Sequence, residues 1–508
     1  MPYDFNPFPP PPRFKRILLN LFVFSAVFIG IALLFASTWL KKTFEIEHFS
    51  QIVFHLKFPV ANAGGSGLVH DFFLKSILPA TFIALLITFS RQTWAVLVFL
   101  FRPMLCFFQK HASGTRLVLA VVMLGLSVNI VVNKWEIKDY FKEQKNISTF
   151  YETHYKPFDF AALEGFKPFQ NLIVIFVEGL PSALSHHDPY APLGDVAPKI
   201  GELATRHINF STNSKMGGLQ QMLGTGWTVA GIAAYLCGVP LNVPPNDAFK
   251  PEYFLNGATC VPDVLHKLGY TQAYLSGTPQ KLGAAELFQA HNVKLLDLQY
   301  LQEQKIVPNP LPKAMTSVTS WSLSDRETFK LAKKKIQGFE KAGKPFALYI
   351  STIDTHGENL AVGTHSCPEM PRSLLDFYKC EDLLIADFVD FVEKSELGKN
   401  TSIVILGDHL PHGGLFQKRV VEYGIFNAFI NTPFEKNVDK EKSKYRFVTH
   451  FDMAPVLLES VGIKSETFGL GRNPFYHQSL LESPFDKNTL NNEIRRGNKM
   501  YDSFWQVE

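Results

Sequence analysis

Residues 171–178 read NLIVIFVE, a short apolar run closed by a carboxylate. A run this short and this rich in β-branched side chains is typical of a strand buried on both faces, as in parallel sheets. Similar runs occur at 346–353 (FALYISTI) and 402–406 (SIVIL), and helical periods separate them, as at 326–341 and 374–394. Strand and helix alternate in this way over roughly 300 residues, which predicts an α/β domain with a mainly parallel sheet flanked by helices.

Polar side chains follow each of these three strands. Glu178 follows the first, Asp354 and His356 follow the second, and Asp408 and His409 follow the third. A single such carboxylate is usually a cap or a solvated turn, but the carboxyl ends of parallel strands meet at one edge of a sheet, where active sites gather. Carboxylate oxygens and neutral imidazole suit a divalent ion such as Mn²⁺ or Zn²⁺. The sequence therefore predicts a metal site at this edge.

A candidate nucleophile lies in the glycine-rich segment GTGWTVAG (224–231), which precedes helical sequence at 232–236. The hydroxyl of Thr228 would stand at a loop-to-helix junction, where the helix N-terminus favours a bound phosphate. On the local sequence alone, an N-cap role explains Thr228 better than a nucleophile role does, and Thr225 is a second nucleophile candidate.

Before residue 134 the chain is dominated by long apolar runs. Ile17–Leu40 contains 24 uncharged residues, enough to span a bilayer core, and Phe72–Ser90 and Leu117–Asn133 are two further expected spans. The first run is longer than the apolar part of a signal peptide and lacks a clear cleavage site, which favours a membrane anchor. We therefore expect an anchor over 1–134, a tether over 135–170 and a catalytic domain over 171–508.

The orientation depends on the apolar segment 92–108, which Arg102 and Pro103 interrupt. Basic residues cluster around it, as expected of a cytosolic loop, and basic residues before Ile17 place the N-terminus inside. Three spans then put everything after Asn133 outside the cytoplasmic membrane. If segment 92–108 also crossed the membrane, the domain would return to the cytosol.

The chain has five cysteines and a net charge of +4. In an exported domain, four of the cysteines could form two disulfides, and the pairing closest in sequence is Cys237–Cys260 and Cys367–Cys380, with Cys106 free. In a cytosolic domain these cysteines would be buried thiols. No dense basic run with interleaved aromatics occurs, so a nucleic-acid partner is not expected.

Five motifs occur in one order along the chain: NLIVIFVE (171–178), GTGWTVAGIAAYLCGVPL (224–241), DTH (354–356), GDH (407–409) and FGLGR (468–472). Together they resemble the lipoteichoic-acid synthase and phosphoglycerol transferase I branch of the alkaline phosphatase superfamily. The resemblance covers about residues 165–475 and implies a sulfatase-like fold. It departs at Phe176, where some members have histidine, and at Ser322, where the family often has the glycine of W-G-x-x-D.

The resemblance implies a metal-dependent double displacement. Glu178, Thr228, Asp408 and His409 match the metal-site positions, and Thr228 matches the nucleophile. His356 matches a histidine that contacts the substrate phosphate, and Trp321 lies where the family has a tryptophan near the glycerol pocket. The implied ion is Mn²⁺, with Zn²⁺ or Mg²⁺ as alternatives. The cysteine pairing also fits the family pattern.

The implied donor is phosphatidylglycerol, whose phosphoglycerol head group would pass through Thr228 to a glycan or glycolipid of a bacterial cell envelope. The catalytic domain would face the periplasm or the outside of a multi-pass membrane protein. Two alternatives remain at this stage. One is a phosphoethanolamine transferase, although residues 224–241 lack that group's T-x-C-G-T block, and the other is a non-catalytic membrane sensor. A sulfatase activity is disfavoured, because the C/S-x-P-x-R motif is absent at the nucleophile position.

Overall fold

The structure is a computed structural model that describes most of the chain. The described residues are 13–43, 48–57, 65–89, 112–168, 170–185, 187–188, 194–243, 253–279, 284–317, 321–356, 366–371, 373–411 and 423–506. Segment 92–108 and Cys106 lie outside them, so the expectations about both stay predictions. The chain divides into two compact units, Met1–Ile52 with Gly64–Phe141, and Val53–Ala63 with Lys142–Glu508.

The first unit contains the predicted spans. Its long helices are α1 (Arg13–Thr43), α3 (Gly65–Phe72) continuing through η2 (Phe73–Ile77) into α4 (Leu78–Phe89), and α7 (Ala112–Lys134). Among the described residues, three helical stretches are long and apolar enough to cross a membrane: Phe14–Thr43, Val69–Phe89 and Arg116–Lys134. Small and β-branched side chains fill their contacts, as is usual between helices in lipid: Val23, Ala26, Val27, Ala84 and Ala120.

The second unit is built on a six-stranded sheet in the order β3-β2-β4-β1-β5-β6. All neighbouring pairs are parallel except β5 with β6, which is antiparallel. The strands are β1 (Asn171–Val177), β2 (Thr271–Ser276), β3 (Lys294–Leu296), β4 (Phe346–Ser351), β5 (Thr401–Gly407) and β6 (Asn427–Ile430). β1, on which the fold prediction rested, lies at the centre between β4 and β5, which confirms the predicted mainly parallel sheet.

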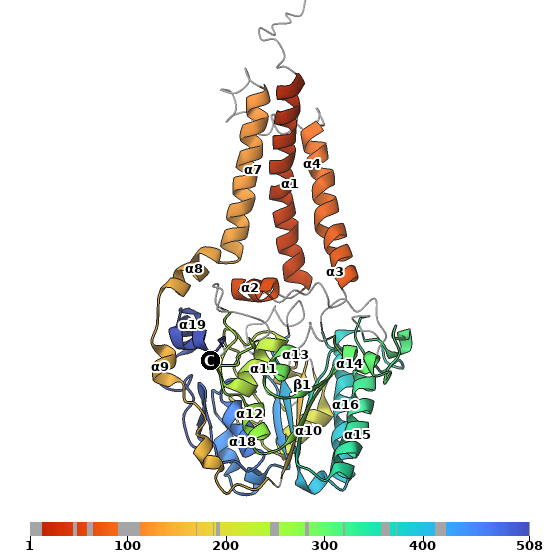
Figure 1. Ribbon diagram of the computed structural model, residues 1–508, viewed down its shortest axis with the longest axis vertical. Coiled ribbons are helices and arrows are strands. Elements are labelled where there is room, and N and C mark those ends of the chain that lie inside the picture. The colour runs from red at the N-terminus through yellow and green to blue at the C-terminus, as the bar shows by residue number, and fades with distance from the viewer. Residues whose placement is uncertain are drawn as a thin grey trace, which may run out of the picture. The chain divides into compact units, whose positions relative to one another are not determined.

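Helices cover both faces of this sheet (Figure 1). Alternate side chains of β1 enter opposite cores, so Leu172, Val174 and Phe176 pack in one and Ile173, Ile175 and Val177 in the other. The first core includes α11 (Thr228–Cys237), α12 (Val261–Lys267), α13 (Ala285–Ala290), α18 (Met453–Glu459), α19 (Lys487–Arg495) and α20 (Lys499–Ser503). The second includes α10 (Pro198–Arg206), α14 (Leu298–Glu303), α15 (Asp325–Ala342) and α16 (Leu374–Lys394).

Two segments outside 171–508 also belong to the second unit. Residues 142–168, expected as part of a tether, contain α9 (Phe150–His154) and place Phe150 and Tyr151 in the core. Helix α2 (Phe49–Lys57) contributes Phe54, whose ring lies 5.9 Å from that of Trp227. Aromatic side chains therefore anchor both segments on the domain, which a search for helical or strand periodicity does not detect. The preceding helix α8 (Ile137–Lys145) crosses the boundary between the units.

The structure joins Cys237 to Cys260 and Cys367 to Cys380, the two pairs that proximity along the chain predicts. Cys237 is the last residue of α11 and Cys260 directly precedes α12. The first disulfide therefore links the helix that begins at Thr228 to its neighbour in the same layer.

Candidate active site

The carboxyl ends of β1 and β5 bring three candidate ligands together. Val177 pairs with Gly407 in the register of these parallel strands, so the next residues, Glu178 and Asp408, leave the sheet side by side. Ligand atoms of Glu178, Asp408 and His409 all lie within 4.8 Å of one another. These residues are only 3%, 1% and 3% exposed. Helix caps and turn residues are usually exposed to solvent, so three buried ionisable groups this close together indicate a candidate functional site.

Backbone contacts fix the direction of each ligand. The amides of Gly179 and His409 both donate to Oδ1 of Asp408, at 2.8 and 2.7 Å. Nδ1 of His409 lies 2.8 Å from the carbonyl oxygen of Leu410 and must donate to it. Nε2 of the same ring therefore faces inward, 3.1 Å from Oε1 of Glu178.

This arrangement fits a cation. In the neutral ring, Nε2 of His409 would carry a lone pair that faces the lone pairs of Glu178, so a proton or a metal ion must lie between them. Burial alone would lower the pKa of His409, but the carboxylates of Asp408 and Glu178 raise it to about 10. Burial raises the pKa of Asp408 to about 7, since it outweighs the opposing charge of His409. Two carboxylates and one imidazole nitrogen are a donor set for Mn²⁺ or Zn²⁺.

Thr228 lies against the same carboxylate. Its Oγ1 donates to Oε2 of Glu178 at 3.0 Å, and its side chain is half-buried. Thr228 is the first residue of α11, and the N-cap position belongs to Trp227, whose backbone is extended and whose side chain makes no cap bond. The structure therefore does not place Thr228 at the N-cap position, and the N-cap interpretation is wrong.

The second nucleophile candidate has a different environment. Thr225 is 0% exposed, and its Oγ1 donates to the carbonyl of Met222 at 2.8 Å and accepts from the amide of the same residue at 3.1 Å. This hydroxyl closes a turn within the loop and has no open side. Of the two threonines, Thr228 is the one positioned to meet a ligand.

The D-T-H turn after β4 reaches the same edge. Oγ1 of Thr355 donates to the backbone carbonyl of Glu178 at 2.6 Å. Burial would raise the pKa of Glu178, but the charges of His356 and His409 outweigh it and lower this pKa to about 2. His356 itself is half-buried, as expected of a group that can meet both the site and a substrate.

Trp321 begins a segment that is connected to this turn. Asp325, four residues later, accepts from the amides of Ile353 at 3.0 Å and Asp354 at 2.6 Å. At the position of the usual glycine, Ser322 is fully buried and its hydroxyl lies 2.5 Å from that of Ser317. The fold therefore accommodates Ser322 in place of the usual glycine. Trp321 is half-buried, and its contact with the glycerol of a substrate stays a prediction.

A further group of residues holds the G-D-H turn against α11. The hydroxyl of Tyr235 donates to the carbonyl of Gly407 at 2.7 Å. Nε2 of His450 donates to the carbonyl of Asp408 at 2.8 Å, and its ring lies 4.5 Å from the Tyr235 ring. Burial lowers the pKa of His450 to about 3, so the ring is neutral. Gly231 completes the contact, because a Cβ there would lie 2.0 Å from the Asp408 carbonyl oxygen.

With this geometry in view, comparison with known proteins identifies the family. Residues 170–463 match the Sulfatase family. The chain belongs to this family. The predicted fold class is thereby confirmed as a sulfatase-like sheet preceded by apolar helices.

Curated relatives and a solved structure are similar to parts of this chain. Phosphoglycerol transferase I of Xanthomonas axonopodis pv. citri (strain 306) is 28% identical over 260 residues, which cover 47% of this chain and 34% of that protein. Phosphoglycerol transferase I of Xanthomonas euvesicatoria pv. vesicatoria (strain 85-10) is 28% identical over 323 residues, covering 60% and 42%. The lipoteichoic acid synthase LtaP of Listeria monocytogenes is similar with a TM-score of 0.43 and 13% identity, covering 67% and 81%. The matched part spans well under half the length of these curated relatives.

Sequence reasoning missed Gly231, Tyr235 and His450, which hold the candidate site together. Thr228, Gly231 and Tyr235 are spaced by three and four residues, so they share one face of α11. That spacing was available in the quoted motif and could have indicated a face directed at the metal-ligand turn. His450 gave no comparable signal, because its partner is a backbone carbonyl 42 residues earlier.

The close contact at Gly231 leads to a test. Gly231→Ala should force α11 away from Asp408, because its Cβ would overlap the carbonyl oxygen. We expect a loss of about 1–3 kcal/mol in unfolding free energy and a weaker affinity for Mn²⁺, measured by denaturant unfolding and calorimetric titration. The matched control is Gly338→Ala in α15, where a Cβ meets nothing within 4 Å and should stabilise the helix by about 0.5–1 kcal/mol. Unchanged stability and metal affinity in Gly231→Ala would contradict this account.

Proposed function

We propose that this chain transfers phosphoglycerol from phosphatidylglycerol to a glycan or glycolipid acceptor of the cell envelope. The observation that carries the proposal is the hydrogen bond from Thr228 to Glu178, a carboxylate that also faces Nε2 of His409. A hydroxyl at a helix start beside a cation-binding cluster is suited to phosphoryl chemistry. The family match and the relatives named phosphoglycerol transferase I support the same activity.

The residues have separate roles in the proposed reaction. Glu178, Asp408 and His409, with Thr228, would hold a divalent ion, which we propose to be Mn²⁺. The ion would neutralise phosphate charge and promote ionisation of the hydroxyl. The Oγ1 of Thr228 attacks the phosphorus as the alkoxide, after its proton has passed to solvent. The bond from phosphorus to the diacylglycerol oxygen breaks, and phosphoglycerol is left on Thr228. The amide groups at the start of α11 stabilise the phosphate oxygens.

His356 would complete the proton balance. It donates a proton to the departing diacylglycerol oxygen in the first step. In the second step it takes a proton from the acceptor hydroxyl, whose oxygen attacks the phosphorus. The bond from phosphorus to Thr228 breaks and releases Thr228 as the alkoxide that began the cycle. Trp321 is proposed to contact the glycerol of the head group.

We also propose that the catalytic domain lies outside the cytoplasmic membrane. Phe54 lies between the first and second candidate spans in sequence, yet it packs with Trp227 and Phe254 in the second unit. The loop after the first span and the domain after the last one are therefore expected on the same side of the membrane. A cytosolic N-terminus and a first span that crosses outward put both of them outside.

Labelling of introduced cysteines tests this topology in intact cells. Leu56 is 76% exposed, so Leu56→Cys should react with a membrane-impermeant maleimide, and so should Asn488→Cys on the exposed side of α19. The background for both is Cys106→Ala, since Cys106 is the cysteine outside the two disulfides. Labelling of either position only after cell lysis would contradict the proposed orientation.

Head-group transfer tests the activity itself. The purified chain in vesicles should release diacylglycerol from phosphatidylglycerol and move its labelled glycerol to a glycan fraction. Phosphatidylethanolamine vesicles are the comparison, and preferred release from them would assign the chain to ethanolamine transfer instead. Binding of both lipids without any release would indicate a sensor and would overturn the proposal.

A further inference from the structure

A glutamine joins the two segments that carry the nucleophile and the histidine ligand. The nucleophile loop, residues 219–227, leads to Thr228, and the metal-ligand turn, residues 407–410, contains His409. Oε1 of Gln221, in the loop, accepts from the amide of Leu410, in the turn, at 2.7 Å. The peptide group between His409 and Leu410 is therefore held by a side chain from the nucleophile loop.

The orientation of the Gln221 amide group follows from its neighbours. A backbone N–H can only donate, so Oε1 and not Nε2 faces Leu410. The Nε2 end lies beside Gly226, where a Cβ would come within 3.1 Å of it. Glycine at position 226 therefore leaves room for the amide group, two residues before α11 begins.

Backbone bonds hold the segment from which the Gln221 side chain extends. Leu219 exchanges two backbone bonds with Ile425, at 2.9 and 2.8 Å. The amide of Gln220 donates to the carbonyl of Val448 at 2.7 Å. Because both preceding residues are bonded to other segments, the side chain of Gln221 starts from a fixed point.

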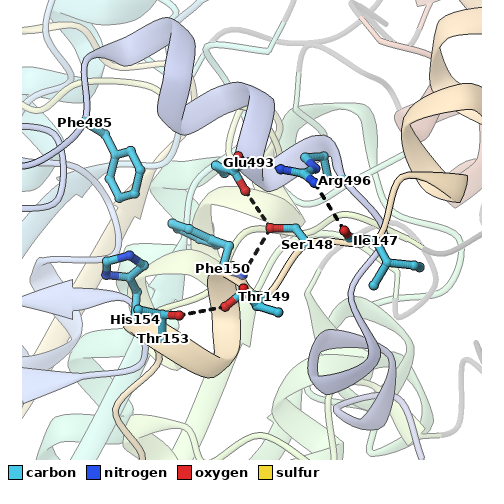
Figure 2. A pocket seen from close by; sticks show the side chains of 9 residues that line it. All are labelled: Ile147, Ser148, Thr149, Phe150, Thr153, His154, Phe485, Glu493 and Arg496. Atoms are coloured by element: carbon cyan, nitrogen blue, oxygen red, sulfur yellow. Dashed lines mark hydrogen bonds and ion pairs between the residues drawn. The ribbon is translucent and has the colours of Figure 1, made fainter.

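Helix α19 supports the next part of the nucleophile loop. Oδ1 of Asn491 accepts from the amide of Leu223 at 2.8 Å. Glu493, two residues later in the same helix, accepts from the Ser148 hydroxyl at 2.5 Å. Figure 2 shows this second contact in a pocket that Phe150 also lines. The nucleophile loop is therefore anchored after the glutamine as well as before it.

The metal-ligand turn transmits this contact to the imidazole. Pro411 disfavours helical backbone at Leu410, since the residue before a proline is restricted to extended conformations. Once Gln221 holds the peptide group before Leu410, the direction of the Leu410 carbonyl is restricted as well. That carbonyl accepts from Nδ1 of His409 at 2.8 Å, and Nε2 of the ring lies 3.1 Å from Oε1 of Glu178. The direction of the ring therefore depends on the glutamine contact.

Contacts to the outer nitrogen of a histidine ligand tune a metal site. The hydrogen bond of one ring nitrogen orients the other toward the ion, and loss of such a partner costs about 10–100-fold in metal affinity or activity. Here the partner of His409 is a backbone carbonyl, which no substitution removes. Gln221 bonds to the adjacent peptide group, so it offers a side chain through which the ring direction can be changed.

We propose that Gln221 is a positioning residue: it holds the peptide group before Leu410 so that Nε2 of His409 stays directed at Glu178. Glu178 is also the carboxylate to which Thr228 donates, so the same contact keeps the nucleophile loop and the metal-ligand turn in register. The proposal rests on the transferase function proposed above and adds to that reaction a residue that contributes no ligand.

Calorimetric titration of the full chain in detergent, with Mn²⁺ alone as the probe, tests this role. Gln221→Leu keeps much of the side-chain volume but removes the acceptor, and we expect Mn²⁺ affinity to fall at least ~10-fold. Gln221→Glu keeps an acceptor for the Leu410 amide and should bind Mn²⁺ as the wild type does. The matched control is Gln302→Leu in α14, which removes a bond to the Pro308 carbonyl and should leave Mn²⁺ affinity unchanged.

Turnover separates positioning from substrate contact. At a Mn²⁺ concentration near the wild-type dissociation constant, kcat for diacylglycerol release should fall in Gln221→Leu, while KM for phosphatidylglycerol stays unchanged. If Gln221→Leu does not fold, Gln221→Asn carries the same expectation, because its amide is one methylene shorter and does not reach Leu410.

Several results would overturn the role of Gln221. They are wild-type Mn²⁺ affinity in the folded variant without the acceptor, an equal loss of affinity in the Gln302→Leu control, no recovery in Gln221→Glu, and no Mn²⁺ binding by the wild type. If the variants rank in Mn²⁺ affinity as expected but the wild type releases no diacylglycerol, the proposed function fails while the role of Gln221 in the site stands.

Discussion

Thr228→Ala is expected to reduce head-group release by on the order of 10⁴-fold or more, since the loss of a covalent nucleophile has effects of that size. The physical reason is the position of Oγ1, 3.0 Å from Glu178 at the first residue of α11. The hydroxyl caps no helix, so its removal should cost little stability. Release is measured as diacylglycerol formed from phosphatidylglycerol, and folding is checked by thermal unfolding.

Two variants control for this result. Thr228→Ser keeps a hydroxyl and should retain measurable release. Thr225→Ser keeps the hydroxyl that closes the turn with Met222 and should be close to wild type. Near-normal release by Thr228→Ala would eliminate the covalent mechanism. If Thr225→Ser lost head-group release while Thr228→Ala retained it, the nucleophile would be Thr225 and not Thr228.

Replacement of a metal ligand should remove the ion and the activity together. Asp408→Asn keeps the size of the side chain but removes one of two negative charges that face His409, and we expect Mn²⁺ affinity to fall by on the order of 100-fold or more. His409→Ala should behave in the same way, because Nε2 is the inward-facing nitrogen. The measurements are metal content after gel filtration and release of diacylglycerol with and without added Mn²⁺.

Asp297→Asn is the matched control for the carboxylate change. Asp297 caps α14 by accepting from the amide of Tyr300, and asparagine caps a helix about as well as aspartate. Its metal content and activity should equal those of the wild type. Full activity of a metal-free Asp408→Asn protein would show that the chemistry does not depend on this cluster.

Much of the second unit could be predicted because its strands are short apolar runs. The run at 171–178 became the central strand, and helix 374–394 matches α16 residue for residue. The strand expected over 346–353 ends at Ser351 instead. The backbone turns there toward Glu178, whose amide donates to Oγ1 of Thr352. Strand β3 is only Lys294–Leu296, too short for a pattern of its own.

The candidate site could also be predicted only in part. Strand ends locate Glu178, Asp408 and His409, because parallel register brings successive carboxyl ends to one edge. Of the supporting residues, Tyr235 shares the face of α11 with Thr228, which its spacing in the motif could have indicated. His450 could not be predicted, since it acts on a backbone carbonyl that carries no sequence signal. The pocket around Phe150 and Glu493 depends on packing between segments more than 300 residues apart, as the Ser148–Glu493 bond shows.

The covalent intermediate tests the central claim most directly. The purified chain is mixed with phosphatidylglycerol labelled in its head-group glycerol, quenched in acid within one turnover and digested for mass spectrometry. The account predicts labelled phosphoglycerol on Thr228, lost when a glycan acceptor is added before the quench and absent in Thr228→Ala. Transfer of the label to the acceptor at the normal rate, with Thr228 unmodified at every time point, would contradict it.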